Sequence, residues 1–253
     1  MRRFYLNPEA CNEPRLLLRG DEAHHAARVL RIEVGERVAV LDGAGRILTC
    51  VVHSVSKAEL LLDPVQTERF PQDPTSISLV CGIPKGGSFD DILDQAIELG
   101  VHEVVPLVTD HGNVRLDSKH AREKHHKWQA AAVESIKQCG SPWLPAVAPV
   151  SNVGQAAARG SATDLVLLSD LRSGSQEIGQ ALEACRTRLG RLPASVSIWV
   201  GPEGDFSPRE LGILQNARAI SVTLGPRVLR CATAAVASVA LLAHQFRLAV
   251  RKG

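Results

Sequence analysis

Residues 197–210 read Ser-Ile-Trp-Val-Gly-Pro-Glu-Gly-Asp-Phe-Ser-Pro-Arg-Glu, which is the pattern of a strand, a glycine-rich loop and a helix in succession. The apolar run that ends at Val200 predicts a buried strand. Ser207, Pro208 and Glu210 have the spacing of a capping box with a proline in the first helical turn. In open α/β sheets, ligands bind beyond the carboxyl ends of the strands. The loop is therefore a candidate ligand site, although an ordinary strand-to-helix turn has the same local pattern.

A second loop of the same kind favours the ligand site. Residues 221–234 read Ser-Val-Thr-Leu-Gly-Pro-Arg-Val-Leu-Arg-Cys-Ala-Thr-Ala, so another strand ends in Gly225 and Pro226. This loop adds Arg227 and Arg230 and leads directly into an apolar helix rich in alanine and valine. Two such loops after successive strands predict one composite pocket.

Strand and helix patterns alternate through the second part of the chain. This alternation predicts a mostly parallel sheet covered by helices. One helix is expected to begin at Ser88, with Asp91 completing a capping box, and to end at Gly100. A longer helix is expected over residues 118–139. The expected strands cover residues 77–82, 103–108, 164–169, 196–200 and 219–224.

The first 63 residues have a different pattern of short apolar runs separated by turn residues, which predicts β-structure. A short helix is expected near residues 22–30. Residues 63–76 hold three prolines among polar residues and are interpreted as a linker. We therefore expect two domains, 1–72 and 73–253.

Composition and motifs exclude several classes of protein. The 253 residues are 45% hydrophobic with a formal net charge of +2, which is typical of a folded globular chain. The chain has no Gly-x-Gly-x-x-Gly, no P-loop and no Gly-x-Ser-x-Gly, so a dehydrogenase, an NTPase and a triad hydrolase are disfavoured. The histidine spacings fit no standard zinc pattern, so we expect no metal. Since no signal peptide is evident and the apolar stretch 231–243 is too short for a membrane span, we expect a cytoplasmic protein without a membrane partner.

The two loops resemble the signature motifs of a known family. Val200-Gly-Pro-Glu-Gly with Phe206-Ser207, and Leu224-Gly-Pro-Arg-Val-Leu-Arg230 with Thr233, are similar to those of the ribosomal small subunit methyltransferase E family, one of the SPOUT methyltransferases. The similarity extends over nearly the whole chain. Further matching segments in the same order are His24-His25, Arg28-Val-Leu-Arg31, Gly35, Asp42-Gly43, Lys85-Gly86, Ile97-Glu-Leu-Gly-Val101, Pro106-Leu107, Thr109, Trp128 and Gln138-Cys139-Gly140.

The resemblance implies a fold and an activity. The expected fold is an N-terminal PUA-like β-barrel, which binds RNA, followed by a SPOUT α/β domain with a C-terminal trefoil knot. The implied activity is S-adenosylmethionine-dependent methylation of uridine N3 in 16S rRNA of the small ribosomal subunit. The implied assembly is a homodimer.

The resemblance also implies roles for individual residues. Glu203 is the candidate base for the N3 proton, and Arg230 is the candidate stabiliser of the charge that develops on the ring. Glu203 as a carboxylate that bonds its own turn, and Arg230 as a structural ion pair, remain alternatives. The residues expected to hold the cofactor are Ser169, Gly201, Gly204, Leu224, Gly225, Leu229 and Thr233. The residues expected to contact RNA phosphates are Arg2, Arg3, Arg28, Arg31, Lys85 and Arg115.

The sequence departs from the family pattern at several positions. Asp205 stands where a second glycine is usual and is a rival candidate for the base, and Ala232 stands where glutamate is usual. His111 replaces a usual arginine, while Ser88 and Ser141 stand where basic residues are common. Two alternative functions stay open: methylation of another RNA position such as a ribose 2′-hydroxyl, and RNA binding by a dimer without catalysis. The first is disfavoured because residues 229–233 lack the asparagine-rich stretch of such enzymes.

Overall fold

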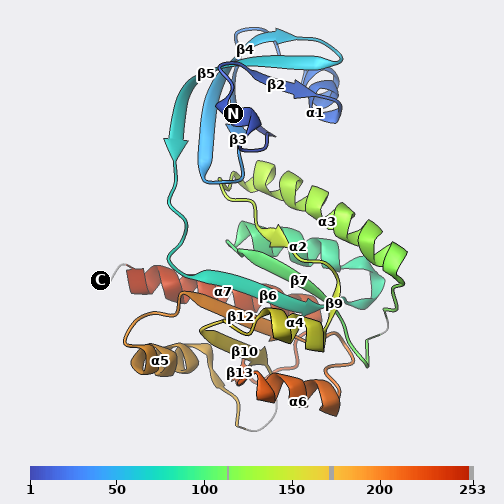
Figure 1. Ribbon diagram of the computed structural model, residues 1–253, viewed down its shortest axis with the longest axis vertical. Helices are drawn as coiled ribbons and strands as arrows, with labels where there is room; N and C mark the ends of the chain where they lie inside the picture. The colour runs from blue at the N-terminus through green and yellow to red at the C-terminus, as the bar shows by residue number, and fades with distance from the viewer. Residues whose placement is uncertain (113, 171–173, 251–253) are drawn as a thin grey trace. The chain divides into compact units, whose positions relative to one another are not determined.

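The computed structural model describes residues 1–112, 114–170 and 174–250 (Figure 1). The chain forms two compact units. The first unit comprises Met1–Gln72 together with Val133–Leu144, and the second comprises Asp73–Ala132 together with Pro145–Gly253.

A curled five-stranded sheet forms the first unit, as expected for a PUA-like domain (Figure 1). The strand order is β1-β3-β4-β5-β2, and all pairs are antiparallel except β1 with β3. A short helix, α1 (Asp21–His24), continues into a π-helical turn, His25–Val29. The strands are β1 (Arg2–Tyr5), β2 (Leu16–Arg19), β3 (Arg37–Leu41), β4 (Arg46–Val55) and β5 (Glu59–Arg69).

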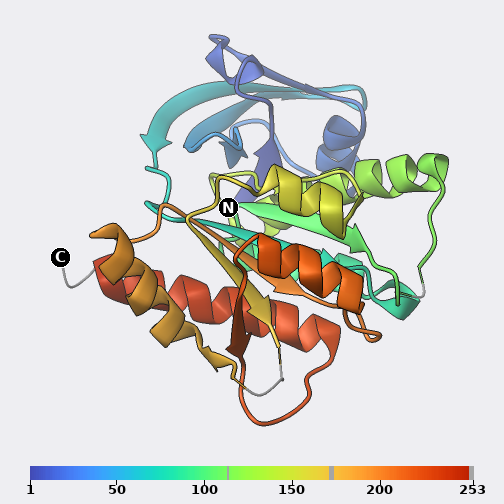
Figure 2. The same ribbon diagram turned by 60° about the horizontal axis from the view of Figure 1, so that its bottom comes forward.

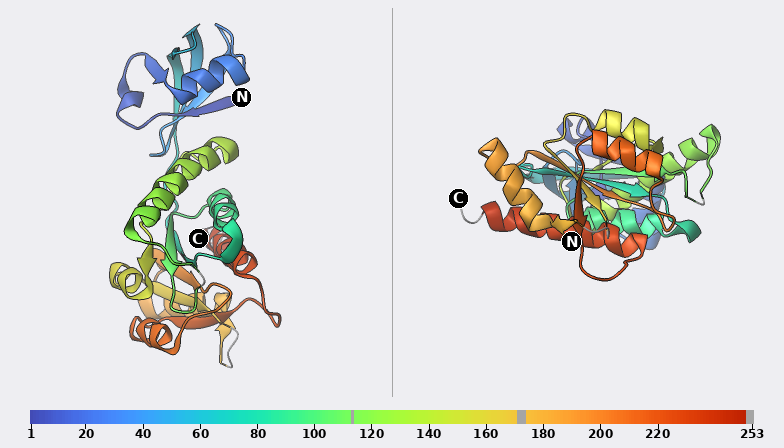
Figure 3. Two further views of the ribbon diagram at one scale, coloured as in Figure 1. Left: turned by 90° about the vertical axis from the view of Figure 1, so that its right-hand side faces the viewer. Right: turned by 90° about the horizontal axis from the view of Figure 1, so that it is seen from below.

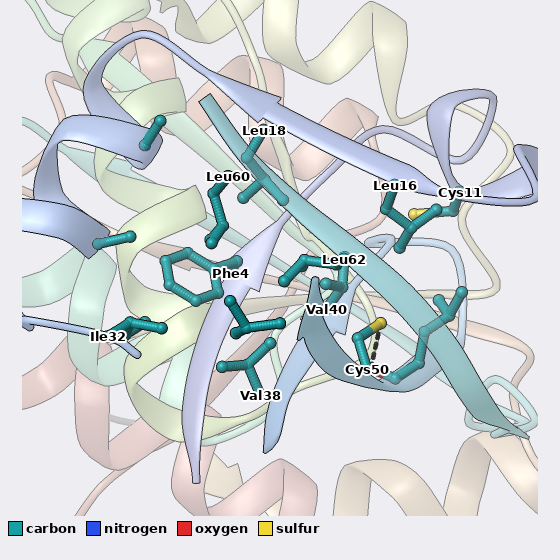
Figure 4. Packing of buried hydrophobic residues seen from close by; sticks show 14 residues of the cluster. Phe4, Cys11, Leu16, Leu18, Ile32, Val38, Val40, Cys50, Leu60 and Leu62 are labelled. Carbon is teal, nitrogen blue, oxygen red and sulfur yellow. Dashed lines mark hydrogen bonds between the residues drawn. The ribbon is translucent and has the colours of Figure 1, made fainter. Parts of the chain in front are cut away.

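Alternation of apolar residues along these strands builds the core of the first unit (Figure 4). Leu16 and Leu18 on β2 lie opposite Leu62 and Leu60 on β5, and all four side chains are buried in the same cluster as Phe4. Successive strand residues point to opposite faces, so this spacing of two places every one of them on the inner face.

The expected linker is partly wrong. Strand β5 continues to Arg69, so residues 63–69 pair with β4 instead of forming an open connection. Pro64 lies opposite Cys50, where the register shifts, and a bulge of this kind tolerates a residue that lacks a backbone N–H.

The second unit holds an eight-stranded sheet whose strands are all parallel. Its order is β11-β13-β10-β12-β6-β7-β8, with β9 also pairing with β7. The expected alternation of strands and helices is confirmed, and the bounds of the five expected strands agree with the sequence pattern within one residue. The strands are β6 (Ser76–Gly82), β7 (Glu103–Val108), β8 (Ala146–Val147), β9 (Ser151–Asn152), β10 (Leu165–Ser169), β11 (Gln176–Glu177), β12 (Ser195–Val200) and β13 (Ile220–Thr223).

Helices cover both faces of this sheet (Figure 3, right). One face carries α4 and α6, which contact each other, and the opposite face carries α2, α5 and α7. These helices are α2 (Phe89–Glu98), α4 (Val153–Arg159), α5 (Ile178–Leu189), α6 (Pro208–Asn216) and α7 (Cys231–Val250), whereas α3 (Ser118–Cys139) has residues in both units.

Helix α7 is longer than the expected apolar stretch. Residues Cys231–Leu248 are long and apolar enough to cross a membrane by length and composition, and 44% of that window is buried inside the protein. The helix packs on α2, β6 and β12, so one of its faces belongs to the core of the second unit.

The two expected capping boxes have different outcomes. The box at Ser207 is confirmed, since its side chain accepts a hydrogen bond from Glu210 N and Glu210 reaches back to Ser207 N. The box at Ser88 is wrong, because the Ser88 side chain makes no capping hydrogen bond. The backbone of Ser88 has a ψ of 3° instead of the extended value of a capping residue, and the turn Lys85–Gly87 precedes it directly.

Candidate active site

The two glycine-rich loops meet at the carboxyl edge of the sheet in the second unit. They form a cavity of about 550 Å³, a volume within the usual range of small-molecule sites. The cavity is lined by Ser169, Asp170, Val200, Gly201, Pro202, Glu203, Asp205, Leu224, Arg227, Val228, Leu229, Arg230, Cys231 and Ala234. The composite pocket expected from the two loops is therefore present.

A tight turn shapes the first loop. Asp205 N donates to Pro202 O at 2.9 Å, which closes the turn around Glu203 and Gly204. Asp205 has a φ of +58°, in the left-handed region that favours glycine. Its Oδ1 accepts a hydrogen bond from Phe206 N at 2.8 Å, which helps to hold this conformation. Glu203 Oε2 also accepts from Lys85 N, with a long separation of 3.4 Å.

A buried carboxylate holds the end of this loop against the segment that follows β7. Glu210 is 2% exposed, and its two oxygens accept hydrogen bonds from Asp110 N at 2.9 Å and Ser207 N at 2.8 Å. Asp110 in turn accepts from Ser207 Oγ at 2.7 Å and forms an ion pair with Arg209. The hydrogen bond from Arg209 is the main reason that the pKa of the Asp110 carboxyl lies below its ordinary value.

The contact between the first loop and the segment that follows β7 requires glycine at position 204. A Cβ at this position would lie 2.6 Å from His111 O, closer than real side chains approach a carbonyl oxygen. The first loop is therefore packed directly on the segment 109–112.

The second loop, residues 224–230, runs from β13 out to the start of α7 (Figure 2). Gly225 has a φ of +121°. Thr223 Oγ1 accepts a hydrogen bond from Gly225 N and donates one to Gly225 O, both at 3.1 Å. A side chain here would be strained by the backbone conformation and not by crowding, since no atom of the described residues lies within 4 Å of a Cβ added to Gly225. Beyond the turn, Val228 is 85% exposed at the edge of the cavity.

One member of a pair of neighbouring thiols lines the cavity. Cys231 lines it, and Cys231 Sγ lies 3.7 Å from Sγ of the fully buried Cys81 at the end of β6. The hydrogen bond between the two thiols, together with burial, raises the pKa of Cys81 well above its ordinary value.

The structure brings six of the nine predicted catalytic and cofactor residues to this cavity. Glu203, Arg230, Ser169, Gly201, Leu224 and Leu229 line it. Gly204, Gly225 and Thr233 are not among the lining residues. Gly204 faces His111, Gly225 forms the turn after β13, and Thr233 is exposed in the first turn of α7.

The six predicted RNA residues differ in their surroundings. Arg2 pairs with Glu36, and Arg3 donates to the carbonyls of Lys137 and Gln138. Arg115 donates to the carbonyls of Thr109 and Asp110. The side chains of Arg28, Arg31 and Lys85 are exposed and form no hydrogen bond or ion pair with the described residues.

Sequence reasoning missed Asp170. This residue follows directly after β10, and its carboxylate accepts from Ser221 Oγ at 3.1 Å while it lines the cavity. Its position at the carboxyl end of a predicted strand was the signal that could have found it.

A larger cavity of about 700 Å³ lies elsewhere in the second unit. Its lining includes Ser78, Glu103, Arg159 and Trp199, on the face covered by α4 and α6. It contains none of the predicted site residues, and Glu103 and Arg159 are already paired with each other. The smaller cavity is therefore the candidate active site.

Comparison with known proteins identifies the class to which this fold and site belong. Residues 71–243 match the RNA methyltransferase domain family, and residues 18–65 match the RNA methyltransferase PUA domain. A methyltransferase from Legionella pneumophila, solved with bound S-adenosylmethionine, has 26% identity and a TM-score of 0.83, covering 96% of this chain and 97% of its own. The fold and the site thus define an RNA methyltransferase with a PUA domain.

Relatives of similar length specify the family. The ribosomal RNA small subunit methyltransferase E of Aquifex aeolicus is 32% identical over 90% of this chain and 93% of its own. The enzyme of the same name from Bacillus subtilis is 28% identical over 93% of this chain and 92% of its own. The chain belongs to the ribosomal RNA small subunit methyltransferase E family.

Proposed function

We propose that this protein methylates N3 of a uridine in 16S rRNA of the small ribosomal subunit, with S-adenosylmethionine as the methyl donor. The observation that carries the proposal is the cavity between the two signature loops, which holds both Glu203 and Arg230. Membership of the methyltransferase E family supports the same reaction.

The lining of the cavity fits this cofactor. Leu224 and Leu229 offer apolar surface to an adenine ring, and the carboxylate of Asp170 can accept hydrogen bonds from ribose hydroxyls or from an ammonium group. Gly201 presents backbone without a side chain, which lets a ligand approach closely. S-adenosylmethionine supplies a methyl group that is already activated on a sulfonium sulfur.

The chemistry left to the protein is alignment and proton removal. Uridine N3 carries a weakly acidic proton, and Glu203 takes that proton so that the nitrogen lone pair can attack. Negative charge then spreads to the ring oxygens beside N3, where the guanidinium of Arg230 stabilises it. The hydrogen bond from Lys85 N to Glu203 Oε2 leaves the other carboxylate oxygen, Oε1, for the proton.

RNA capture is assigned to both units. Arg28 and Arg31 are the strongest candidates in the first unit, because their exposed guanidinium groups can neutralise phosphates without breaking a contact to the described residues. Lys85 serves the same purpose beside the active site. Arg2, Arg3 and Arg115 would contribute charge while keeping their structural contacts. The protein acts in the cytoplasm, where ribosomes are found, as a homodimer with a knotted C-terminal segment.

A direct experiment tests the reaction. Mass spectrometry of 16S rRNA from a strain that lacks this gene is expected to show one uridine without its N3 methyl group. Restoring the wild-type gene is expected to restore the methyl group, whereas a Glu203→Gln gene is expected to restore little. An unmodified ribose 2′-hydroxyl instead would support the alternative reaction. A normal modification pattern, together with no binding of S-adenosylmethionine, would support RNA binding without catalysis.

A further inference from the structure

Asp205 carries a side chain where the backbone favours glycine. Its φ of +58° lies in the left-handed region, which costs free energy for every residue except glycine, although aspartate tolerates it better than most. The hydrogen bond from Phe206 N offsets part of this cost. A glycine would form the same turn without strain, so the turn itself does not account for the carboxylate.

The carboxylate of Asp205 lies on the wall of the active-site cavity. A Cβ built on Gly201 would be 2.9 Å from Asp205 Oδ1, and both residues line the cavity. The charged groups among the described lining residues are the carboxylates of Asp170, Glu203 and Asp205 and the guanidinium groups of Arg227 and Arg230. Asp205 contributes one of the three negative charges among these described groups, so replacing it with a neutral residue makes the local charge more positive by one unit.

The cofactor and its product differ in charge at one atom. The sulfonium of S-adenosylmethionine is positive, and the thioether of S-adenosylhomocysteine is neutral. The product also lacks the transferred methyl group, and the remaining groups are the same, so a protein can distinguish the two by charge only through the potential at the sulfur. The negative charge of Asp205 on this wall therefore favours the cationic compound.

We propose that Asp205 makes this cavity select S-adenosylmethionine over S-adenosylhomocysteine, so that the product leaves more readily after each turnover. The inference rests on the proposed function, which places the cofactor in this cavity. It assigns Asp205 a role in specificity, whereas Glu203 keeps the role of base.

The size of the effect follows from the cavity. A sphere of the observed volume has a radius of about 5 Å. Across about 5 Å, one unit charge changes the affinity ratio about fourfold in water-like surroundings, and about fifteenfold where the effective dielectric constant is half that of water. Asp205 is exposed, so the effect should weaken as salt screens the charge.

Calorimetric titration of the purified protein with each compound tests the proposal. The measured quantity is the Kd for S-adenosylhomocysteine divided by the Kd for S-adenosylmethionine, at about 0.02 M and about 0.3 M ionic strength. Asp205→Asn keeps the shape of the side chain and the acceptor for Phe206 N, and it is expected to lower the ratio about four- to fifteenfold at low salt. Asp205→Gly should lower the ratio equally, because it removes the same charge. Asp91→Asn is the matched control, since Asp91 is exposed on α2 and outside the cavity lining.

The outcomes separate the inference from the proposed function. If the wild type binds S-adenosylmethionine and Asp205→Asn leaves the ratio unchanged, the role of Asp205 is overturned and the proposed function stands. A lowered ratio that is the same at both ionic strengths also overturns the charge argument. If the wild type binds neither compound, the cavity is not the cofactor site and the proposed function fails with the inference.

Discussion

Replacing Glu210 should lower both the stability of the second unit and the affinity of the active site for S-adenosylmethionine. The buried carboxylate accepts hydrogen bonds from Asp110 N and Ser207 N, at 2.9 and 2.8 Å. A hydrogen bond to a charged acceptor contributes about 1.5–3 kcal/mol, and its loss leaves a backbone N–H without a partner. Glu210→Ala removes both acceptors and is expected to lower the free energy of unfolding by about 3–5 kcal/mol.

The conservative variant gives the decisive comparison. Glu210→Gln keeps one carbonyl oxygen but replaces the other acceptor with a donor, so it should cost about 1.5–3 kcal/mol. Glu183→Ala is the control, because Glu183 is an exposed residue on α5 paired with Arg186, and its loss should cost less than about 1 kcal/mol. Urea unfolding measures all three values, and calorimetry measures S-adenosylmethionine affinity, which should fall more for Glu210→Ala than for the control. A Glu210→Ala variant as stable as the control would refute the bridging role of this carboxylate.

Three further predictions concern the active site and the response to acid. Gly225→Val should abolish binding of S-adenosylmethionine, because a β-branched residue is strained at a φ of +121°, while the far-ultraviolet circular dichroism spectrum stays native. Gly212→Ala on α6 is the control. Unchanged affinity in the folded Gly225→Val variant would show that Gly225 is not needed for cofactor binding. Glu203→Gln should lower the single-turnover rate about a hundredfold at saturating S-adenosylmethionine, and a near-normal rate beside an inactive Asp205→Asn enzyme would transfer the role of base to Asp205. Stability should fall in acid, because hydrogen bonds from Arg15, Arg209 and Arg191 lower the pKa of Asp63, Asp110 and Asp164 in the folded state. This stability is present above the ordinary pKa of 3.8 of these carboxyls and is lost as pH falls through their lower pKa values in the folded state. The urea midpoints should therefore be constant from neutral pH to about 5 and decrease below about 4. Equal midpoints at every pH would contradict a stabilising role of these three ion pairs.

Local signals in the sequence were sufficient for much of the second unit. The Ser207, Pro208 and Glu210 pattern specified both the start of α6 and its capping box, because all the interacting groups lie within one turn. The apolar runs likewise specified five of the strands. The position of the two glycine-rich loops after successive strands likewise predicted the composite cavity.

Contacts between distant segments could not be read in the same way. Asp110 lies 100 residues before Glu210, and no local pattern shows that its N–H meets this carboxylate. The β-pattern of the first 63 residues also did not show that the four residues of β1 pair in parallel with β3, which begins more than 30 residues later. The sequence also did not reveal that Gly204 faces His111 instead of the cavity, because the presence of a glycine does not show which neighbouring group leaves no room for a side chain. The trefoil knot stays a prediction.

The composition of the first unit has a consequence for how the chain folds during synthesis. Residues 133–144 belong to that unit, and they supply Pro142 O to Gly45 N and Leu144 N to Gly43 O. A ribosome that has released only residues 1–72 has therefore delivered a sheet in which the backbone groups of Gly43 and Gly45, in the turn between β3 and β4, still lack these partners. The unit is completed only after about 70 further residues have emerged, and by then β6, α2 and β7 are already outside the exit tunnel. Completion of the first unit and the start of the parallel sheet are thus events of the same stage of translation.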